Sequence, residues 1–287
     1  MPELPEVEAL SRFLGEQLVG RTISRVDVAA ISALKTFDPP IDALRGRTIT
    51  GTGRRGKHVL IHADPVWLVI HLARGGWIKW VEQFNPKPLK PGRGPLALRV
   101  RLEGGDGIDV TEAGTEKRLA VWLANDPDDI ENVATLGPDP LTDAFDVAAL
   151  HAALNAAGNT QIKGALTDQR LIAGVGNAYS DEALHMAKLS PFKQSAKLND
   201  DEVSRLYDAV VTVLRDAVDR SLGLPAKGLK SEKKEGLRVH GKAGQPCPVC
   251  GDTIRDVHFA SKSLQYCATC QTGGKPLADR RLSRLLK

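Results

Sequence analysis

The sequence predicts an α+β protein with more than one domain: a β-sandwich preceded by an N-terminal helix, a helical domain, and a four-cysteine zinc finger. Three observations predict this fold class. Short apolar segments recur at close intervals up to residue 124, apolar residues at helical spacing follow them, and the four cysteines form two CxxC pairs near the C-terminus. With 287 residues, of which 42% are hydrophobic, the chain is long enough for two ordinary domains with their own cores.

The first element is a short amphipathic helix over residues 6–19. Its apolar residues are three or four positions apart and a glycine follows them: Val7, Leu10, Leu14, Leu18 and Gly20. The helix begins within the unusual opening MPELPEVE, which has two prolines among three glutamates. We therefore expect the N-terminus to be held in place by a packed helix and not to form a disordered leader.

Residues 21–124 have the patterns of β-strands. The apolar segments in this range are ISRVDV, HVLIHA, WLVIHL, LALRVRL and KRLAVWLA. In LALRVRL, aliphatic residues alternate with Arg99 and Arg101, which indicates a strand with one buried and one polar face. Clusters of glycine and proline such as NPKPLKPGRGP separate the segments as loops. Several strands at such short intervals are typical of a sandwich or barrel.

Helical patterns follow a turn-rich stretch at residues 125–141, NDPDDIENVATLGPDPL. One apolar stripe runs from Val147 to Leu154, and Gly158 ends it. A longer stripe covers residues 203–218, and the sequence NDDE at residues 199–202 predicts a capping box at its start.

The chain is predicted to divide into four segments. Residues 1–124 form the N-terminal β-sandwich, 125–141 a linker, 142–236 the helical domain, and 237–287 the zinc finger and a basic tail. Residues 221–242 are rich in glycine and lysine, and we expect them to link the helices to the zinc finger.

The charge of the chain is unevenly distributed. The net charge is +4, but residues 220–287 contain 14 Lys or Arg and 5 Asp or Glu, so this part is +9 and the remainder is −5. A basic C-terminal part of this kind either meets a polyanion or is a solvated face of a stable domain. Charge alone does not choose between these two interpretations.

The sequence predicts neither a membrane-spanning segment nor a secretory signal. The longest apolar run, Val66–Leu72, is short and contains His71. The N-terminus is acidic and lacks an apolar signal core. We therefore expect a cytoplasmic protein that does not bind membranes.

The cysteines read C-x2-C-x16-C-x2-C and are Cys247, Cys250, Cys267 and Cys270. This spacing predicts one structural zinc ion held by four thiolates. The alternatives are a pair of disulfides or a redox-active CxxC, and a reducing cytosol opposes structural disulfides. His258 lies between the two pairs, but four thiolates already complete the site. No organic cofactor is predicted.

Two further stretches are suited to binding a phosphate. In GVGN, Gly176 and Asn177 stand just before a helical pattern, where backbone N–H groups and a side-chain amide can bind an anion. Glycine-rich connections between helices are also common without an anion. In RRGKHV, Lys57 lies at a turn into a strand, where a basic residue is often only solvated. Together with the zinc finger and the basic tail, these stretches favour nucleic acid over a small anion.

The order of these pieces resembles the formamidopyrimidine-DNA glycosylase/endonuclease VIII family. The matching stretches are PELPEVE, RRGKH, IHLARGG, LGPDPL, DQRLIAGVGNAYSDEAL and LRVHGKAGQPCPVCG. They extend from Pro2 to about Cys270, and the N-terminus is closer to the formamidopyrimidine-DNA glycosylase branch. The resemblance implies a DNA glycosylase with AP lyase activity in base-excision repair and a helix-two-turn-helix form for the helical domain. It also implies a monomer that binds double-stranded DNA containing damaged bases or abasic sites, and so associates with the nucleoid.

The resemblance assigns catalytic roles to the N-terminal residues. Removal of Met1 leaves Pro2 with a secondary amine, which attacks the sugar C1′, expels the base and forms an iminium ion that leads to β,δ-elimination. Glu3 is implied to move protons at the sugar. Glu6 is implied to bind water or the amine; the alternative is a charge that stabilises the helix N-terminus. Lys57 is counted with this group because it would hold a phosphate beside the lesion.

The same resemblance implies how the DNA is gripped once the damaged base has left the stack. Asn177 with Gly176, and the finger hairpin with Lys262, would clamp the phosphates around the lesion. Lys163, in TQIKGAL, matches a family lysine near the site, and the alternative is an exposed helix lysine.

Three departures from the family pattern bear on lesion recognition. Arg74 stands where relatives usually carry a methionine that fills the hole left by the flipped base. Lys117, Arg118 and Leu119 stand where the family has an Arg-Arg-Phe wedge; Leu119 is either an apolar wedge or an ordinary strand residue. Lys262 stands where the finger usually has arginine, and lysine neutralises a phosphate without the bidentate fork.

These departures affect two expectations: which lesions the protein recognises, and whether it is catalytic. The tract GLPAKGLKSEKKEG is shorter than the lesion-capping loop of 8-oxoguanine enzymes, which favours a broader range such as oxidised pyrimidines or ring-opened purines. The alternative function is a lesion- or abasic-site-binding protein with little or no catalysis. The altered reading residues favour it, and the intact Pro2 and Glu3 oppose it. A zinc-dependent hydrolase is disfavoured because a four-thiolate site has no open position for water.

Overall fold

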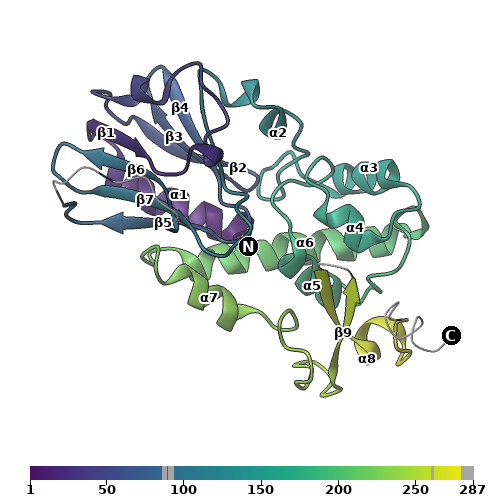
Figure 1. Cartoon of the computed structure of the whole chain (residues 1–287). Coiled ribbons are helices and arrows are strands. Elements are labelled where there is room, and N and C mark those ends of the chain that lie inside the picture. The colour runs from purple at the N-terminus through teal and green to yellow at the C-terminus, as the bar shows by residue number, and fades with distance from the viewer. Residues whose placement is uncertain (86–88, 90–93, 260–261, 279–287) are drawn as a thin grey trace. The chain divides into compact units, whose positions relative to one another are not determined.

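The structure of the chain is a computed structural model (Figure 1). It describes residues 1–85, 89, 94–259 and 262–278, without the side chains of Phe259 and Lys262. The chain divides into two compact units, and each is described by itself. The first comprises Met1–Thr135 and Ser221–Lys230, and the second comprises Leu136–Arg220 and Ser231–Lys287. Within the described residues, every helix is too short or too polar to cross a lipid bilayer.

The first unit contains two four-stranded antiparallel sheets. One sheet has the order β1 (Ile23–Val28), β6 (Leu96–Leu102), β7 (Gly107–Glu112) and β5 (Gly76–Val81). The other has the order β2 (Gly51–Arg55), β3 (His58–Ala63), β4 (Val66–His71) and β8 (Ala120–Ala124). Side chains from both sheets belong to one hydrophobic core, which confirms the predicted β-sandwich.

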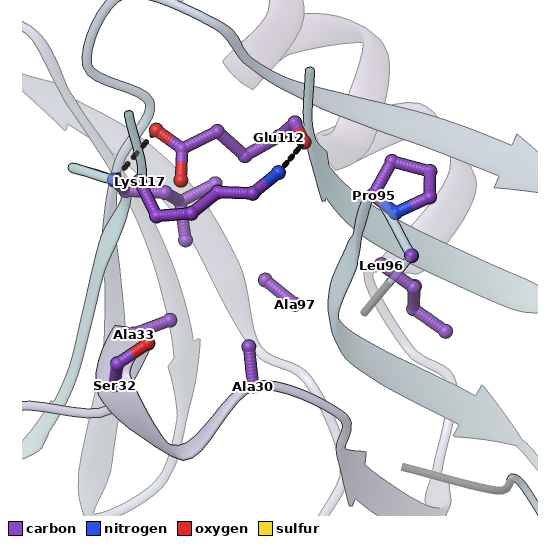
Figure 2. A pocket seen from close by; sticks show the side chains of 10 residues that line it. Ala30, Ser32, Ala33, Pro95, Leu96, Ala97, Glu112 and Lys117 are labelled. Carbon is purple, nitrogen blue, oxygen red and sulfur yellow. Dashed lines mark hydrogen bonds between the residues drawn. The ribbon is translucent and has the colours of Figure 1, made fainter. Parts of the chain in front are cut away.

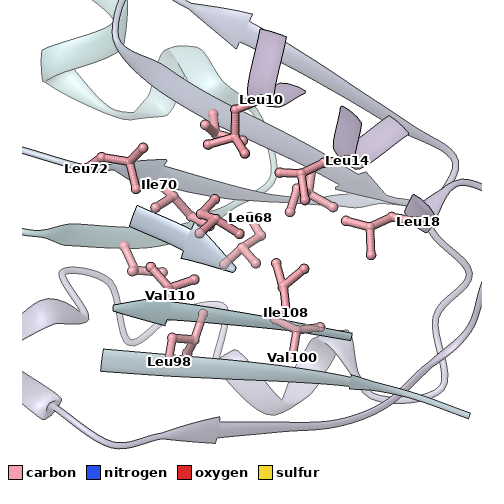
Figure 3. Packing of buried hydrophobic residues seen from close by; sticks show 14 of the residues in the cluster. Leu10, Leu14, Leu18, Leu68, Ile70, Leu72, Leu98, Val100, Ile108 and Val110 are labelled. Atoms are coloured by element: carbon pink, nitrogen blue, oxygen red, sulfur yellow. The ribbon is translucent and has the colours of Figure 1, made fainter. Parts of the chain in front are cut away.

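Helix α1 (Leu4–Leu18) packs its apolar stripe into this core. Its residues Leu10, Leu14 and Leu18 are fully buried, and Figure 3 shows them beside Leu68 and Ile70 of β4. The labelled residues from β6 and β7 are Leu98, Val100, Ile108 and Val110. Burial of each such leucine contributes about 1.5–3 kcal/mol, so the stripe predicted from the sequence anchors α1 and the residues that precede it.

Strand β6 has the alternation that its sequence predicts. Its aliphatic side chains face the core, while Arg99 and Arg101 lie on the other face. Arg99 pairs with Asp109 at 2.6 Å, and Arg101 pairs with Asp27 at 2.9 Å. The polar face is thus neutralised by carboxylates from the neighbouring strands.

Three strands lie outside the apolar segments that predicted the others. Strand β2 reads GTGRR and has no apolar side chain. It is an edge strand of its sheet and pairs with β3 from Gly51↔His62 to Arg55↔His58. The other two, β5 and β7, read GWIKWV and GIDVTE, where a glycine and a charged residue interrupt the apolar pattern.

Residues 221–230 belong to the first unit and are not only a linker. Leu224, Ala226 and Leu229 pack on the sandwich core. The indole Nε1 of Trp77 donates a hydrogen bond to the carbonyl oxygen of Ala226 at 3.1 Å. Helix α7 (Leu229–Gly236) begins there, although glycines and lysines in this stretch predicted a link between the helices and the zinc finger. The remaining short helices of this unit are η1 (Ile31–Ala33), η2 (Ile41–Leu44), η3 (Pro127–Asp129) and α2 (Glu131–Ala134).

The second unit combines helices with a small hairpin. The helices are α3 (Val147–Ala157), α4 (Ile162–Thr167), α5 (Asn177–Met186), η4 (Ser195–Lys197) and α6 (Asp200–Ser221). The hairpin pairs β9 (Ile254–Phe259) with β10 (Lys262–Cys267), and α8 (Ala268–Thr272) follows it. The predicted capping box before α6 is confirmed: the amide of Glu202 donates to Asn199 Oδ1 at 2.9 Å and the amide of Asn199 donates to Glu202 Oε2 at 3.0 Å.

Candidate active site and nucleic-acid interface

The residues around Pro2 are fixed by a capping box at the start of α1. Glu3 is the N-cap residue, and its amide donates to Glu6 Oε2 at 2.8 Å while its own carboxylate accepts from the amide of Glu6. Glu3 is 2% exposed and Glu6 is 1% exposed, and Pro2 is buried beside them. The structure therefore gives Glu6 a helix-capping part, which was the alternative to binding water or the amine. It also holds Pro2 and two carboxylates in one place.

Lys57 lies in the tight turn between β2 and β3 and is only 7% exposed. Gly56, just before it, has φ +53°, a conformation that favours glycine. Strand β2 is tied to α1 by the Arg54–Glu8 ion pair at 3.0 Å and by a hydrogen bond from Thr52 Oγ1 to the carbonyl oxygen of Ser11 at 2.9 Å. The helix that Glu3 caps thus also anchors the strand that leads to Lys57.

Two histidines next to Lys57 were not singled out from the sequence. His58 and His71 are cross-strand neighbours in β3 and β4, with ring centroids 4.8 Å apart. Burial, together with the nearby positive charge of Lys57, lowers the pKa of His58 to about 4 and that of His71 to about 3. Both rings are therefore neutral near pH 7. Only the register of β3 against β4 brings them together, and the sequence pattern does not give that register.

This pair predicts that the first unit loses stability in acid. The pKa values of both histidines in the folded protein lie below the value of about 6.5 in an unfolded chain. The unfolded state therefore binds more protons below pH 6.5, and stability falls as the pH drops from about 6.5 toward 4. We expect a loss of about 2 kcal/mol from each histidine, about 4 kcal/mol for the pair, between pH 7.5 and 5, which replacement of both histidines by glutamine reduces.

Urea unfolding followed by tryptophan fluorescence measures this effect in the first unit alone. All four tryptophans, Trp67, Trp77, Trp80 and Trp122, belong to that unit. A double variant whose midpoint changes with pH as much as that of the parent protein would show that the pair is not the cause.

Two loops of the first unit carry the residues that depart from the family pattern for lesion recognition. Arg74 is exposed in the turn between β4 and β5, and Lys117 and Arg118 are exposed in the loop between β7 and β8. The amide of Ala113 donates to the carbonyl oxygen of Gly75 at 3.0 Å and joins the two loops. The structure therefore brings Arg74 together with the segment that carries the predicted wedge.

Glu112 organises the second of these loops (Figure 2). It is 3% exposed, and its Oε1 accepts hydrogen bonds from the amides of Arg118 at 2.8 Å and Leu119 at 2.9 Å. Lys117 Nζ donates to the carbonyl oxygen of Glu112 at 2.5 Å. Arg118 pairs only loosely with exposed Glu116, at 3.2 Å. Among the three wedge candidates, Arg118 is thus the side chain most available to DNA.

Leu119 does not project as a wedge in this conformation. It is 2% exposed, belongs to the sandwich core and lines a cavity of about 260 Å³ under the loop. This is the place of an ordinary strand residue, the alternative to the wedge. Leu119 could enter a base stack only after the loop from Ala113 to Arg118 had released it from Glu112.

The junction of the two loops depends on Gly75. A Cβ atom at this position would lie 2.3 Å from the carbonyl oxygen of Ala113. We expect Gly75→Ala to push the loops apart and to destabilise the first unit by about 1–3 kcal/mol. Gly53→Ala is the control, because a Cβ at Gly53 meets no described atom within 4 Å. Equal unfolding midpoints of the two variants, measured by tryptophan fluorescence, would rule out this close contact.

In the second unit, Asn177 is the first residue of α5 and Gly176 is its N-cap. The loop before them is shaped by Gln169, another residue missed from the sequence. Its Oε1 accepts from the amide of Gly174 at 2.9 Å, and its Nε2 donates to the carbonyl oxygen of Val175 at 2.8 Å. The amide of Asn177 contacts the finger hairpin: Nδ2 donates to the carbonyl oxygen of Ser263 at 2.8 Å.

Lys163 lies beside Asn177 and is not the exposed helix lysine of the alternative. Its ammonium donates to Asp181 Oδ1 at 2.6 Å, to Ser180 Oγ at 2.9 Å and to the carbonyl oxygen of Asn177 at 3.1 Å. An ammonium has three N–H donors, so all of them are used within the protein. Lys163 is therefore neither an exposed helix lysine nor a free phosphate contact, but an internal support of the first turn of α5.

The four cysteines form one compact group whose sulfur atoms all lie within 4.8 Å of one another. The Cys247–Cys270 and Cys250–Cys267 sulfur distances are 3.8 and 3.4 Å, and none of the four forms a disulfide. A zinc tetrahedron with bonds of about 2.3 Å has sulfur–sulfur edges of about 3.8 Å, so the group fits zinc. His258 pairs instead with Asp256 at 2.6 Å. Lys262 begins β10, and its side chain lies outside the described part of the structure.

Comparison with known proteins identifies the family of this chain. Three family models match: the formamidopyrimidine-DNA glycosylase N-terminal domain over residues 1–117, its H2TH domain over 136–225, and the zinc finger found in FPG and IleRS over 244–273. The formamidopyrimidine-DNA glycosylase of Symbiobacterium thermophilum is 35% identical over 98% of this chain and 93% of its own length. The chain belongs to the formamidopyrimidine-DNA glycosylase family.

Other family members extend the comparison. A formamidopyrimidine-DNA glycosylase-like protein of Mycobacterium tuberculosis is 60% identical over 153 residues, which are 53% of this chain and 94% of that protein. The Lactococcus lactis Fpg, solved in a complex with DNA containing an abasic site, has a TM-score of 0.82 and 26% identity, covering 94% of this chain and 99% of that one. The family models confirm the helix-two-turn-helix form of the helical domain and the four-cysteine finger.

Proposed function

We propose that this protein is a bifunctional DNA glycosylase and AP lyase of base-excision repair, acting on oxidised bases in double-stranded DNA. The capping box at the start of α1 carries this proposal. It holds Pro2 next to Glu3 and Glu6, two carboxylates that are almost completely buried. Membership of the family supports the reaction class, since its named members are formamidopyrimidine-DNA glycosylases.

The chemistry begins with Pro2 after removal of Met1. The neutral secondary amine attacks C1′ of the damaged nucleotide, so that a nitrogen–carbon bond forms while the bond from C1′ to the base breaks and the base leaves with the electron pair. Loss of the N–H proton and opening of the C1′–O4′ bond, with O4′ taking up a proton, then give the iminium ion, which acidifies the C2′ proton. Loss of that proton releases the 3′ phosphate, a second elimination releases the 5′ phosphate, and water frees the amine. Glu3 is the proposed proton carrier at the sugar, because its carboxylate is held within one residue of Pro2.

DNA is held by groups from both units. In the first unit Lys57, Arg74 and Arg118 are the proposed cationic contacts, and Arg118 is the most exposed of the wedge candidates. In the second unit the amides at the start of α5, with Asn177, are suited to a phosphate because a helix N-terminus favours an anion. Lys262 adds a phosphate contact from the hairpin, and one zinc ion on the four cysteines keeps the hairpin folded.

The proposed lesion range is broad and includes ring-opened purines and oxidised pyrimidines. Arg74 replaces the residue that usually fills the hole in the duplex, and a guanidinium can both stack and donate hydrogen bonds there. Leu119 is buried in the core. Arg118 and Lys117 are therefore the proposed contacts to the base opposite the lesion. The proposed enzyme is a cytoplasmic monomer.

Borohydride trapping tests the proposal. The protein, confirmed by mass to lack Met1, is incubated with a duplex containing an abasic site and reduced. A covalent complex whose linked peptide begins at Pro2 supports the lyase mechanism. Linkage only at a lysine, or no complex from protein that binds the duplex, would favour the alternative of a lesion-binding protein without this chemistry. Excision from duplexes with single oxidised bases then defines the lesion range.

Binding should also weaken steeply with salt, because phosphate contacts dominate the affinity of DNA-binding proteins. Between 50 and 200 mM salt we expect the affinity for an abasic duplex to fall by at least about tenfold, and Asn177→Ala to weaken it at both concentrations. Fluorescence anisotropy with a labelled duplex measures this. A flat response to salt would argue against the proposed clamp.

A further inference from the structure

Helix α5 is attached to the finger along one face. Its contacts begin at the first turn, where Asn177 reaches the hairpin, and continue at Asp181, which accepts from His240 Nδ1 at 2.6 Å and from the amide of Gln265 at 3.1 Å. Glu182 accepts from the amides of Arg238, Val239 and His240 at 2.8–2.9 Å. Asn177 and Asp181 are four residues apart and are therefore neighbours on the helix surface. At 3.6 residues per turn, Glu182 also falls within the same half of the helix surface.

The last member of this face contacts the metal site itself. His185, in the last turn of α5, is 3% exposed, and its Nε2 lies 3.2 Å from Cys247 Sγ. Cys247 is likewise buried, at 3% exposed. The hydrogen bonds of Asn177, Asp181 and Glu182 reach backbone atoms or the ring of His240. His185 instead reaches a sulfur atom that would bind the metal.

We propose that His185 is a positioning residue of the zinc site, which donates its Nε2–H to the Cys247 thiolate and so couples metal binding to helix α5. This inference rests on the proposed zinc binding. A zinc-bound thiolate can only accept a hydrogen bond, so Nε2 carries the proton. His185 is not a fifth ligand, because the described residues that converge on the site are the four cysteines.

The hydrogen bond matters for two physical reasons. Four thiolates around one Zn²⁺ carry a net charge of −2, and a donor aimed at one sulfur stabilises that excess charge, as hydrogen bonds to charged groups are the strong ones. The ring also fixes the Cys247 sulfur relative to α5, the helix that begins with Asn177. Partners that hold metal ligands in this way typically change metal affinity by about 10–100-fold when they are removed.

Three variants test the role. His185→Phe keeps a buried ring without a donor, His185→Gln keeps an N–H donor near the position of Nε2, and His151→Phe is a control at an exposed histidine of α3. The full-length proteins are loaded with zinc, and the apparent metal affinity is measured by competition with a chromogenic chelator. Cobalt-substituted samples give the energy of the sulfur-to-metal charge-transfer band.

We expect His185→Phe to weaken zinc binding by about 10–100-fold and to shift the charge-transfer band to lower energy, with His185→Gln between it and the parent. His151→Phe should match the parent. If His185→Phe retains the affinity and the band of the parent, the proposal is overturned. If the parent protein and all of its variants fail to bind zinc, the zinc site itself is refuted. Both outcomes are read from metal binding and do not depend on DNA.

A measurement on the unaltered protein covers the case in which His185→Phe does not fold. In the zinc-loaded protein, long-range ¹⁵N–¹H correlation should show His185 as the neutral tautomer with hydrogen on Nε2. A proton on Nδ1 alone would exclude the hydrogen bond to Cys247 and with it the proposal.

Discussion

Extending the N-terminus by a few residues before Pro2 is expected to reduce base excision and borohydride trapping by about 1,000-fold or more, because the nitrogen of Pro2 then lies in a peptide bond and is no nucleophile. Binding to an abasic duplex should change little. The proposed phosphate contacts, Lys57, Asn177 and the hairpin, do not include Pro2, and the capping box is formed by Glu3 and Glu6.

The matched variant is Pro2→Gly. It keeps an α-amino group at the same place but makes it a primary amine, so we expect a smaller loss of excision than the extension causes. Gel assays of excision and trapping, with anisotropy for binding, separate the two effects. An extended protein that still excises bases at the rate of the parent would refute the assignment of the nucleophile, and loss of binding in parallel would show that the extension disturbs the fold.

The sequence was sufficient for the parts of the fold that depend on apolar periodicity. The stripe on α1 and the alternation in β6 were predicted because burial selects for a repeating pattern of side chains. Strand β2 was not predicted, because an edge strand such as GTGRR is held by its backbone pairing with β3. Residues 221–230 were expected to be a linker, since three separate apolar residues between glycines do not form a pattern that identifies core packing.

The candidate site shows a similar division. Cysteine spacing indicated the metal site, since the chemistry of zinc fixes both the residue type and the short CxxC turns. The resemblance indicated Pro2 and Glu3 by their place in a motif. Neither kind of information gives contacts between distant segments. Register and packing, which only the folded chain specifies, determine three such features. They are the pairing of His58 with His71, the burial of Leu119 and the internal contacts of Lys163.

Lys163 illustrates contacts that a motif does not reveal. A lysine near a phosphate-binding loop is readily taken as a phosphate contact. Here its three donors are used by Asn177, Ser180 and Asp181, and Asp181 also accepts from the finger. Its positive charge therefore compensates a fully buried carboxylate that joins α5 to the hairpin. An effect of Lys163 on DNA binding would act through the position of Asn177.

Removal of one zinc ligand by Cys250→Ser is expected to abolish stoichiometric zinc binding and to weaken DNA binding by about tenfold or more, which corresponds to about 1.4 kcal/mol or more. Cys250 is exposed, so the small change of side chain does not disturb a packed core. The effect on DNA arises because β10 ends with the zinc ligand Cys267, and the same strand supplies the Ser263 carbonyl that Asn177 contacts.

His258→Gln is the control for this variant, because His258 lies between the cysteine pairs but bonds to Asp256. It should keep one zinc ion per chain and nearly the affinity of the parent for DNA. Zinc is measured by mass spectrometry of the metal and binding by anisotropy.

If Cys250→Ser binds DNA like the parent after losing its zinc, the helices alone hold the hairpin in place, and the contacts of Asp181 and Glu182 with residues 238–240 and 265 are sufficient without the metal. If affinity falls together with zinc, the metal is required to keep the hairpin against α5, since the residues that form those hydrogen bonds are unchanged in the variant.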